Sequence, residues 1–143
     1  MSTTLRNILL VEDNEGDVEW TQLAFKRSNI AVDLKVAYDG MEAMDYLATL
    51  EDGQLPDLIL LDLNMPRMDG KTFLTLIKKD ERLKSIPVIV LTSSDALRDV
   101  KDCYARYANC YIIKPFNFDD LVVIVKQIES FWINLIQLPQ RSG

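Results

Sequence analysis

Acidic side chains stand directly after two short apolar runs of the sequence. Residues 8–11 are followed by Glu12 and Asp13, and residues 58–61 are followed by Asp62. If both runs are parallel strands, their carboxyl ends meet at one edge of a sheet, where ligand sites of such sheets form. Two carboxylates at about 4 Å repel by roughly 4 kcal/mol at an effective dielectric constant near 20. We therefore expect a divalent cation among the three acids, and hard oxygen ligands of this kind favour Mg²⁺.

A hydroxyl group and an ammonium group follow two further apolar runs in the same way. Thr92 comes directly after residues 88–91, and Lys114 comes directly after residues 111–113. A phosphoryl group transferred to a carboxylate needs its non-bridging oxygens neutralised, by a metal on one side and by a lysine or hydroxyl group on the other. Neither residue is specific when taken alone, but together with the acids they predict phosphoryl chemistry at this edge.

Five apolar runs alternate with longer segments of helical periodicity, which is typical of a parallel sheet covered by helices on both faces. The expected strands lie at residues 7–11, 33–37, 57–61, 87–91 and 109–113. Helix start signals stand at Asn14, Asp39, Asp95 and Asn117, and the last helix is expected to end at Pro139. We therefore predict an α/β fold with five strands and five helices, forming one domain over residues 1–143.

Composition and charge argue against several classes of function. The 143 residues carry a net charge of −6 and include no histidine. Negative charge disfavours direct nucleic-acid binding, and the lack of imidazole removes Ser-His-Asp hydrolysis and histidine-ligated zinc from consideration. No stretch approaches the roughly 20 apolar residues that cross a bilayer, so we expect a cytoplasmic protein without membrane contact. Cys103 and Cys110 form no metal or disulfide pattern and are expected to be buried thiols.

Taken together, these residues resemble the receiver domain of two-component response regulators. Three segments carry the resemblance: residues 9–14 with the acidic pair, residues 62–70 with the sequence Asp-Leu-Asn-Met-Pro-Arg-Met-Asp-Gly, and residues 111–116 with a Lys-Pro step. The similarity covers roughly residues 5–130. It implies a flavodoxin-like, doubly wound sheet of strand order 2-1-3-4-5, with residues 131–143 as an extended last helix and tail.

The resemblance also implies a chemical role for each matching residue at the acidic edge. Asp62 would be the phosphoacceptor, supplied by a sensor histidine kinase. A Mg²⁺ ion would be held by Glu12, Asp13, Asp62 and the backbone carbonyl of Asn64. The chain would then catalyse only its own phosphotransfer and dephosphorylation.

The last two strands would carry the phosphoryl-binding groups and a switch. By the same resemblance, Thr92 and Lys114 would bind the attached phosphoryl group. Thr92 and Tyr111 would form a switch pair that transmits phosphorylation to partner proteins. The Lys114–Pro115 bond is expected to be cis by analogy.

Three alternatives share the fold or part of the chemistry. A flavodoxin-type module needs a phosphate-cradling loop after the first strand, but residues 12–15 carry negative charge there. An aspartyl-phosphate hydrolase acting on small phosphoesters would normally place its nucleophile after the first strand, with a second Asp two residues on, and Asp62-Leu63-Asn64 does not match that pattern. An adaptor that works without phosphorylation is disfavoured by the intact acidic site but stays open.

The C-terminal segment is more apolar than one core-facing helix stripe requires. Phe131, Trp132 and Leu135 are among its apolar residues. Because large apolar patches are rare on monomers, we expect a homodimer through the last helix with these three residues at its interface. The segment is also similar to the tails of single-domain response regulators that partner phytochrome-type histidine kinases, which implies a phytochrome light-signalling phosphorelay.

Overall fold

A five-stranded parallel sheet forms the centre of the computed structural model, which describes residues 6–27 and 31–131. The strands are β1 (Arg6–Val11), β2 (Val32–Ala37), β3 (Leu58–Leu61), β4 (Val88–Thr92) and β5 (Cys110–Ile113), in the order β2-β1-β3-β4-β5. The helices in these ranges are α1 (Glu15–Lys26), α2 (Gly40–Ala48), α3 (Gly70–Lys79), α4 (Leu97–Ala105) and α5 (Phe118–Ile128), with a 3₁₀ turn η1 (Asp52–Gln54). The predicted fold class and strand order are confirmed.

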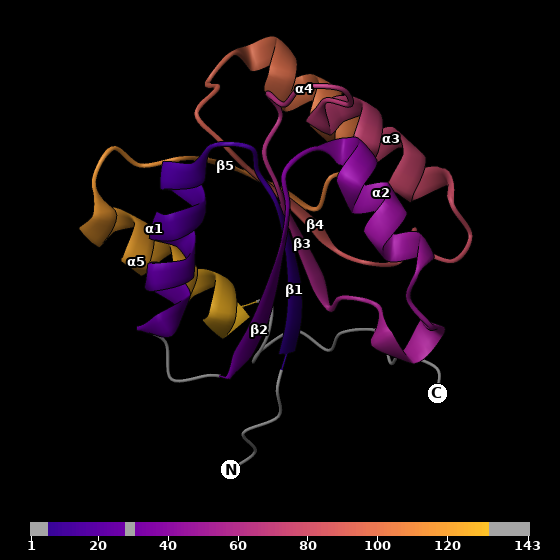
Figure 1. Ribbon diagram of the computed structural model, residues 1–143. Helices are drawn as coiled ribbons and strands as arrows, with labels where there is room; N and C mark the ends of the chain where they lie inside the picture. The colour runs from indigo at the N-terminus through magenta and orange to yellow at the C-terminus, as the bar shows by residue number, and fades with distance from the viewer. Residues whose placement is uncertain (1–5, 28–30, 132–143) are drawn as a thin grey trace.

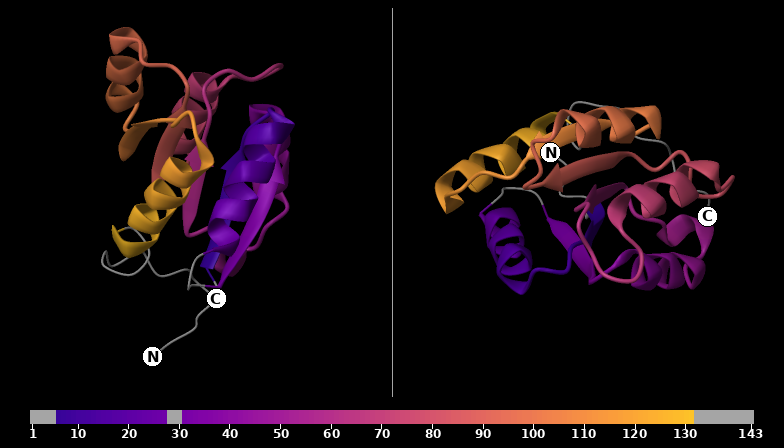
Figure 2. Two further views of the ribbon diagram at one scale, coloured as in Figure 1. Left: turned by 90° about the vertical axis from the view of Figure 1, so that its left-hand side faces the viewer. Right: turned by 90° about the horizontal axis from the view of Figure 1, so that it is seen from above.

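Side chains alternate between two hydrophobic cores along the central strands. Successive strand residues point to opposite faces of a sheet, so Leu9 and Ile59 lie in one cluster while Ile8 and Leu60 lie in the other. The first cluster is covered by α2, α3 and α4, and the second by α1 and α5, which run side by side (Figure 1; Figure 2). β3 and β4 are buried along their whole length, as expected for strands covered on both faces.

Side chains cap four of the helices at their N-termini, and α4 is the exception. The caps are Asn14, Asp39, Asp69 and Asn117, each accepting from the backbone N–H three residues on. α4 begins at Leu97 after Ala96, which makes no side-chain cap bond. α4 exposes Leu97 and Tyr104 and buries Cys103. The expectation of buried thiols is therefore correct for Cys103, while Cys110 is only half-buried.

The last helix changes character at its C-terminal end. α5 ends at Ile128, and residues 129–131 form a π-helical turn. The predicted continuation to Pro139 lies outside the described residues, as do Trp132 and Leu135.

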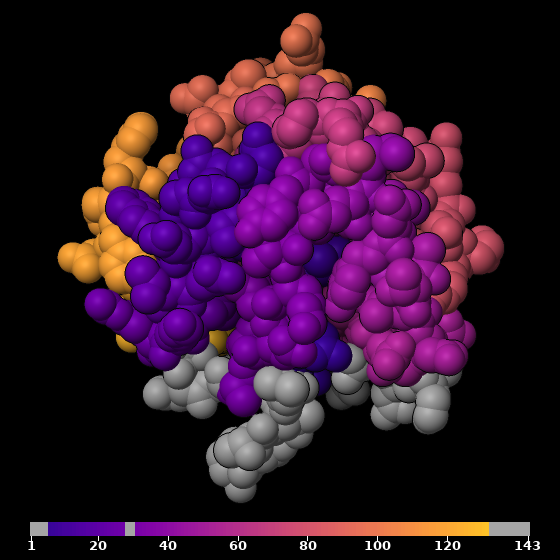
Figure 3. All heavy atoms as spheres, in the orientation of Figure 1, coloured from indigo at the N-terminus to yellow at the C-terminus, as the bar shows by residue number. Residues whose placement is uncertain are grey.

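Two of the recesses in the described part of the chain lie at the amino-terminal end of the strands. One of about 770 Å³ lies between the C-terminal part of α2 and the loop before β4, and its lining includes Met44 and Arg82. A second of about 290 Å³ is lined by residues of β1, β2 and α2, among them Leu9 and Lys35; Figure 3 shows indigo atoms of the N-terminal strand in this hollow. Neither lining includes the acids that follow β1 and β3.

Candidate functional site

The carboxyl ends of β1 and β3 bring three acids together. The backbone N–H of Asp62 donates to the carbonyl of Val11 at 2.9 Å, which fixes the end of β3 beside β1. Carboxylate oxygens of Glu12, Asp13 and Asp62 all lie within 4.8 Å of one another. Glu12 and Asp62 are only 2% and 6% exposed, whereas Asp13 is open to solvent. We call Glu12, Asp13 and Asp62 the acidic rim; they lie together as expected from their places at the strand ends.

Burial makes negative charge costly at the acidic rim. Burial raises the pKa of the Glu12 carboxyl to about 7; the hydrogen bond from Lys114 opposes this shift, and the charge of Asp62 adds to it. Within the part of the chain that the structure describes, Asp62 Oδ1 is buried and accepts no hydrogen bond. A buried polar atom without a partner calls for an explanation, such as an ion. Three carboxylates, one of them facing solvent, fit a hard divalent cation.

Lys114 places its ammonium group among the acids. Its Nζ lies 2.5 Å from Glu12 Oε1, 2.8 Å from Asp17 Oδ2 and 3.8 Å from Asp62 Oδ1. Burial works to lower the pKa of Lys114, but hydrogen bonds to Asp17 and Glu12 outweigh it and the pKa is raised, so the group stays charged. The backbone N–H of Lys114 donates to the carbonyl of Thr92 at 2.8 Å, which holds the end of β5 against β4. The ammonium group of Lys114 therefore lies at the acidic rim, as predicted.

Asp17 is a member of this cluster that the sequence pattern did not identify. Its position near the start of α1 predicted only a favourable charge at the positive end of the helix. Asp17 and Lys114 are 97 residues apart, and no spacing rule relates them.

Thr92 is fully buried at the carboxyl end of β4. It pairs in register with Ile113, the residue before Lys114, so it borders the same edge of the sheet. The backbone N–H of Ser94 approaches Thr92 Oγ1 at 3.5 Å. Thr92 therefore stands where a phosphoryl-binding hydroxyl group was predicted, next to the loop that leads into α4.

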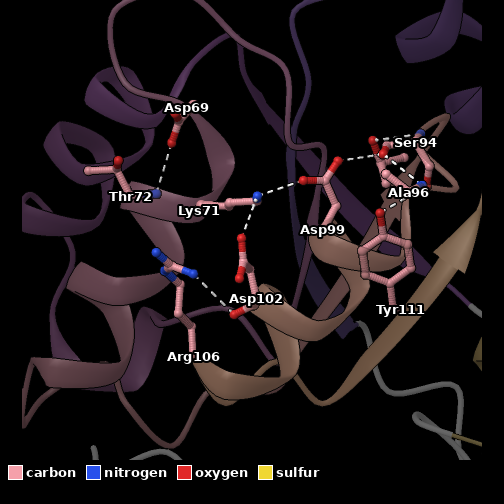
Figure 4. Close-up of polar contacts among 10 residues, drawn as sticks. Asp69, Lys71, Thr72, Ser94, Ala96, Asp99, Asp102, Arg106 and Tyr111 are labelled. Atoms are coloured by element: carbon pink, nitrogen blue, oxygen red, sulfur yellow. Dashed lines mark hydrogen bonds and ion pairs between the residues drawn. The ribbon is translucent and has the colours of Figure 1, made fainter.

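A polar network joins Tyr111 to α4 and α3 (Figure 4). The Tyr111 hydroxyl group donates to the carbonyl of Ser94 at 2.8 Å, and the Ser94 hydroxyl group donates to Asp99 Oδ2 at 2.5 Å. Lys71 Nζ, at the start of α3, donates to Asp99 Oδ1 at 2.6 Å and to Asp102 Oδ2 at 2.9 Å. The predicted switch aromatic thus holds the β4–α4 loop, and the loop is tied in turn to the helix that follows Asp62.

The loop after Asp62 turns back sharply into α3. Arg67 lies in the left-handed region with φ 61°, and its guanidinium group donates to both carboxylate oxygens of Asp39, at 2.7 and 3.1 Å. The N–H of Gly70 donates to the carbonyl of Leu63 at 2.9 Å. A Cβ at position 70 would lie 2.3 Å from the carbonyl oxygen of Asp62. Glycine at this position therefore allows α3 to begin directly behind Asp62.

Two expectations about neighbouring loops have different outcomes. Asn64 is exposed two residues beyond Asp62, and its carbonyl stays a predicted metal ligand. The described residues contain no cis peptide bond, so the expected cis Lys114–Pro115 bond is wrong and the bond is trans. Trans is the more stable isomer of an X–Pro bond by about 0.5–1 kcal/mol unless tertiary contacts select cis.

The sequence matches the family model of the response regulator receiver domain over residues 8–126. The chain belongs to this receiver family. The family match and the acidic rim disfavour the flavodoxin-type and small-phosphoester hydrolase alternatives. Among the helices of residues 6–27 and 31–131, the receiver has none with the length and apolar character needed to cross a bilayer.

Known proteins similar to this receiver include response regulators with solved structures. Response regulator Rcp1 of Synechocystis sp. is 44% identical over 135 residues, which is 92% of either chain. FilR2 of Methanothrix harundinacea, described as a probable methanogenesis regulatory protein, is 40% identical over 134 residues, 92% of this chain and 86% of FilR2. The phosphorylated cyanobacterial phytochrome response regulator RcpA matches with a TM-score of 0.89 at 43% identity, covering 96% of this chain and 100% of RcpA. The Mn²⁺-bound form of Rcp1 matches with a TM-score of 0.85 at 42% identity, covering 94% and 99%. The predicted resemblance to phytochrome response regulators is confirmed.

Proposed function

We propose that this receiver takes a phosphoryl group from the phosphohistidine of a sensor histidine kinase onto Asp62. The observation that carries the proposal is the buried Asp62 Oδ1, which accepts no hydrogen bond from the described residues and lies 3.8 Å from Lys114 Nζ. An unpartnered carboxylate oxygen beside a fixed positive charge is available as a nucleophile. The rim is open on the side of Asp13, which is exposed, and an incoming donor can approach there.

The transfer requires a carboxylate nucleophile and neutralisation of the phosphoryl oxygens. An oxygen of Asp62 forms a bond to phosphorus while the bond from phosphorus to the kinase imidazole nitrogen breaks, and that nitrogen keeps the electron pair. Lys114 carries a positive charge at the rim, and we assign it and the Thr92 hydroxyl group to the phosphoryl oxygens. Water later attacks the same phosphorus, the bond from phosphorus to the Asp62 oxygen breaks, and phosphate leaves while Asp62 returns to a carboxylate. Both steps act on the chain itself, so catalysis is limited to its own modification.

A divalent cation fits the acidic rim, and we propose that it is Mg²⁺. Glu12, Asp13, Asp62 and the carbonyl of Asn64 would hold it; the first three already place oxygens within 4.8 Å. When bound, the ion supplies positive charge that offsets the carboxylates and the phosphoryl oxygens. The Mn²⁺-bound form of the relative Rcp1 supports a divalent cation in this family.

Thr92 and Tyr111 form the proposed output switch. The Tyr111 hydroxyl group holds the carbonyl of Ser94 at 2.8 Å, in the same loop whose Ser94 N–H lies 3.5 Å from Thr92 Oγ1. If Thr92 moves toward a phosphoryl group on Asp62, the contacts of this loop change. Tyr111 then repacks, and the surface of α4 and β5 changes for a partner.

Labelling by acetyl phosphate with Mg²⁺ tests the phosphoacceptor. Wild type should gain one phosphoryl group by intact-mass spectrometry, and Asp62→Asn should gain none. Asp95→Asn is the matched control, because Asp95 is an exposed acid in the loop after β4 and outside the acidic rim. Equal labelling of Asp62→Asn and wild type would place the acceptor elsewhere, and unlabelled wild type would favour a phosphorylation-independent adaptor.

A phytochrome-type histidine kinase is the proposed donor, in a light-signalling phosphorelay in the cytoplasm. The support is the similarity to RcpA, whose description names it a phytochrome response regulator. Phosphotransfer profiling against a panel of histidine kinases tests this. A phytochrome kinase should label wild type fastest, and faster labelling by an unrelated kinase would contradict the assignment.

We also propose that the chain, as a single receiver domain over residues 1–143, forms a homodimer through its last helix. Ile113 on β5, Val123 on α5 and Phe131 beyond it are 49%, 53% and 48% exposed, so these elements present apolar side chains to solvent. Trp132 and Leu135 continue the segment in sequence. The double variant Trp132→Glu, Leu135→Glu should be monomeric by light scattering, while Met41→Glu on α2 should keep the wild-type mass. An unchanged mass of the double variant would refute the interface.

A further inference from the structure

Asp17 makes an unusual contact for an acid at its position in a helix. It is the third residue of α1, where an acidic side chain commonly reaches back to the backbone N–H of the capping residue. Here the N–H of the cap, Asn14, donates instead to Glu12 Oε2 at 3.1 Å. Asn14 still caps the helix by accepting from the N–H of Asp17 at 2.9 Å. The carboxylate of Asp17 is therefore not used in capping and bonds Lys114 Nζ at 2.8 Å.

The three acidic neighbours of Lys114 have different roles in the proposed reaction. Glu12 is a proposed ligand of the cation, and Asp62 gives up its free oxygen to phosphorus. Asp17 belongs to neither group, because the acids that gather within 4.8 Å among the described residues are Glu12, Asp13 and Asp62. Asp17 is therefore the partner of Lys114 that the chemistry leaves unchanged.

We infer that Asp17 is a positioning residue, which holds the Lys114 ammonium group at the rim while Glu12 and Asp62 change partners. The inference rests on the proposed function of Asp62 as phosphoacceptor. Lys114 has three N–H donors, and the 2.8 Å bond to Asp17 fixes the direction of one of them. A second donor, which now bonds Glu12, can then pass to a phosphoryl oxygen without the side chain leaving the site. Without Asp17 the ammonium group must be held by Glu12 and Asp62, the two acids whose partners change during the reaction.

Beryllofluoride binding at saturating Mg²⁺ tests this role, because the complex imitates a phosphoryl group on a carboxylate. Asp17→Asn should weaken beryllofluoride binding about threefold, the size expected for a partly exposed ion pair. Asp17→Glu should restore at least half of the loss. Glu15→Gln removes the same charge from the same turn of α1, and Glu15 forms no ion pair with Lys114 among the described residues, so binding should stay at the wild-type level.

A double-mutant cycle separates positioning from general charge or stability. If Asp17 acts through Lys114, Asp17→Asn should have no further effect on beryllofluoride binding in a Lys114→Met background. The inference is overturned if Asp17→Asn binds like wild type, if Glu15→Gln loses as much as Asp17→Asn, or if the loss persists without Lys114. Failure of wild type to bind beryllofluoride would instead refute Asp62 as the phosphoacceptor.

Discussion

Replacing Asp62 by asparagine should stabilise the metal-free protein while abolishing its phosphorylation. The acidic rim concentrates negative charge in a buried place, and Asp62 Oδ1 lies there without a hydrogen bond from the described residues. A site arranged to bind a cation carries a cost in stability when the cation is absent. Removing one charge should lower that cost.

The magnitude follows from the distances. At an effective dielectric constant near 20, Lys114 at 3.8 Å attracts Asp62 by about 4 kcal/mol, and an ionised carboxylate within 4.8 Å repels it by at least about 3 kcal/mol. If both Glu12 and Asp13 were fully ionised and unscreened, their two repulsions would exceed the attraction by Lys114. Glu12 is partly protonated near pH 7 and solvent screens the exposed Asp13, so the total repulsion falls until it nearly cancels the attraction. What remains is the desolvation of the unpartnered oxygen, which costs at least about 1–3 kcal/mol because the group is charged. Asp62→Asn should raise the free energy of unfolding by about this amount.

Urea unfolding in EDTA and in Mg²⁺ provides the assay. In EDTA at pH 7 the urea midpoint of Asp62→Asn should exceed that of wild type, and the free energy of unfolding of Asp95→Asn should stay within about 0.5 kcal/mol of the wild-type value. At a hundredfold excess over its dissociation constant for wild type, Mg²⁺ should stabilise wild type by about 2–3 kcal/mol and Asp62→Asn by less. If Asp62→Asn is less stable than wild type in EDTA, the rim is not destabilised by its own charge.

Three further predictions address neighbouring features. Because burial raises the pKa of Glu12 from 4.5 to about 7 in the folded chain, ionising Glu12 opposes folding. Metal-free wild type should therefore lose stability relative to Glu12→Gln as pH rises from 4.5 to about 7. If the free energies of unfolding of the two proteins changed in parallel with pH, the prediction would be wrong. Gly70→Ala should lower the free energy of unfolding in urea by about 1–3 kcal/mol and slow acetyl phosphate labelling, because its Cβ would lie 2.3 Å from the Asp62 carbonyl oxygen. Stability equal to that of wild type would show that the loop can shift to accept the extra methyl group. Lys71→Met should raise amide hydrogen exchange several-fold over residues 93–102, because Lys71 binds Asp99 and Asp102 on α4; unchanged exchange would show that α4 is held by packing alone.

The sheet and its acidic rim could be predicted because both follow from local patterns. Buried strands read as continuous apolar runs, and β3 and β4 are buried along their whole length. The residue after each run must then lie at the carboxyl edge, which is how Glu12 and Asp62 were found. Asn14 and Asn117 were found as helix caps because a cap is specified within three residues.

Contacts between distant residues could not be predicted in the same way. The bond from Lys114 to Asp17 spans 97 residues, and the bond from Lys71 to Asp99 spans 28. Each depends on how helices pack on the sheet, and acids and lysines outside the apolar stripes carry no period that reveals a partner. The prediction of a cis Lys114–Pro115 bond was wrong for a related reason. The cis and trans isomers are similar in free energy, so tertiary contacts decide between them.

Mapping the phosphorylated residue tests the central claim most directly. Borohydride reduces an acyl phosphate, so a chain phosphorylated by a histidine kinase and then reduced should carry homoserine at the acceptor, which peptide mass spectrometry can locate. We predict homoserine at position 62 and unmodified Asp13 and Glu12. Homoserine at another acid, or a phosphorylated chain whose Asp62 survives reduction unchanged, would contradict the assignment.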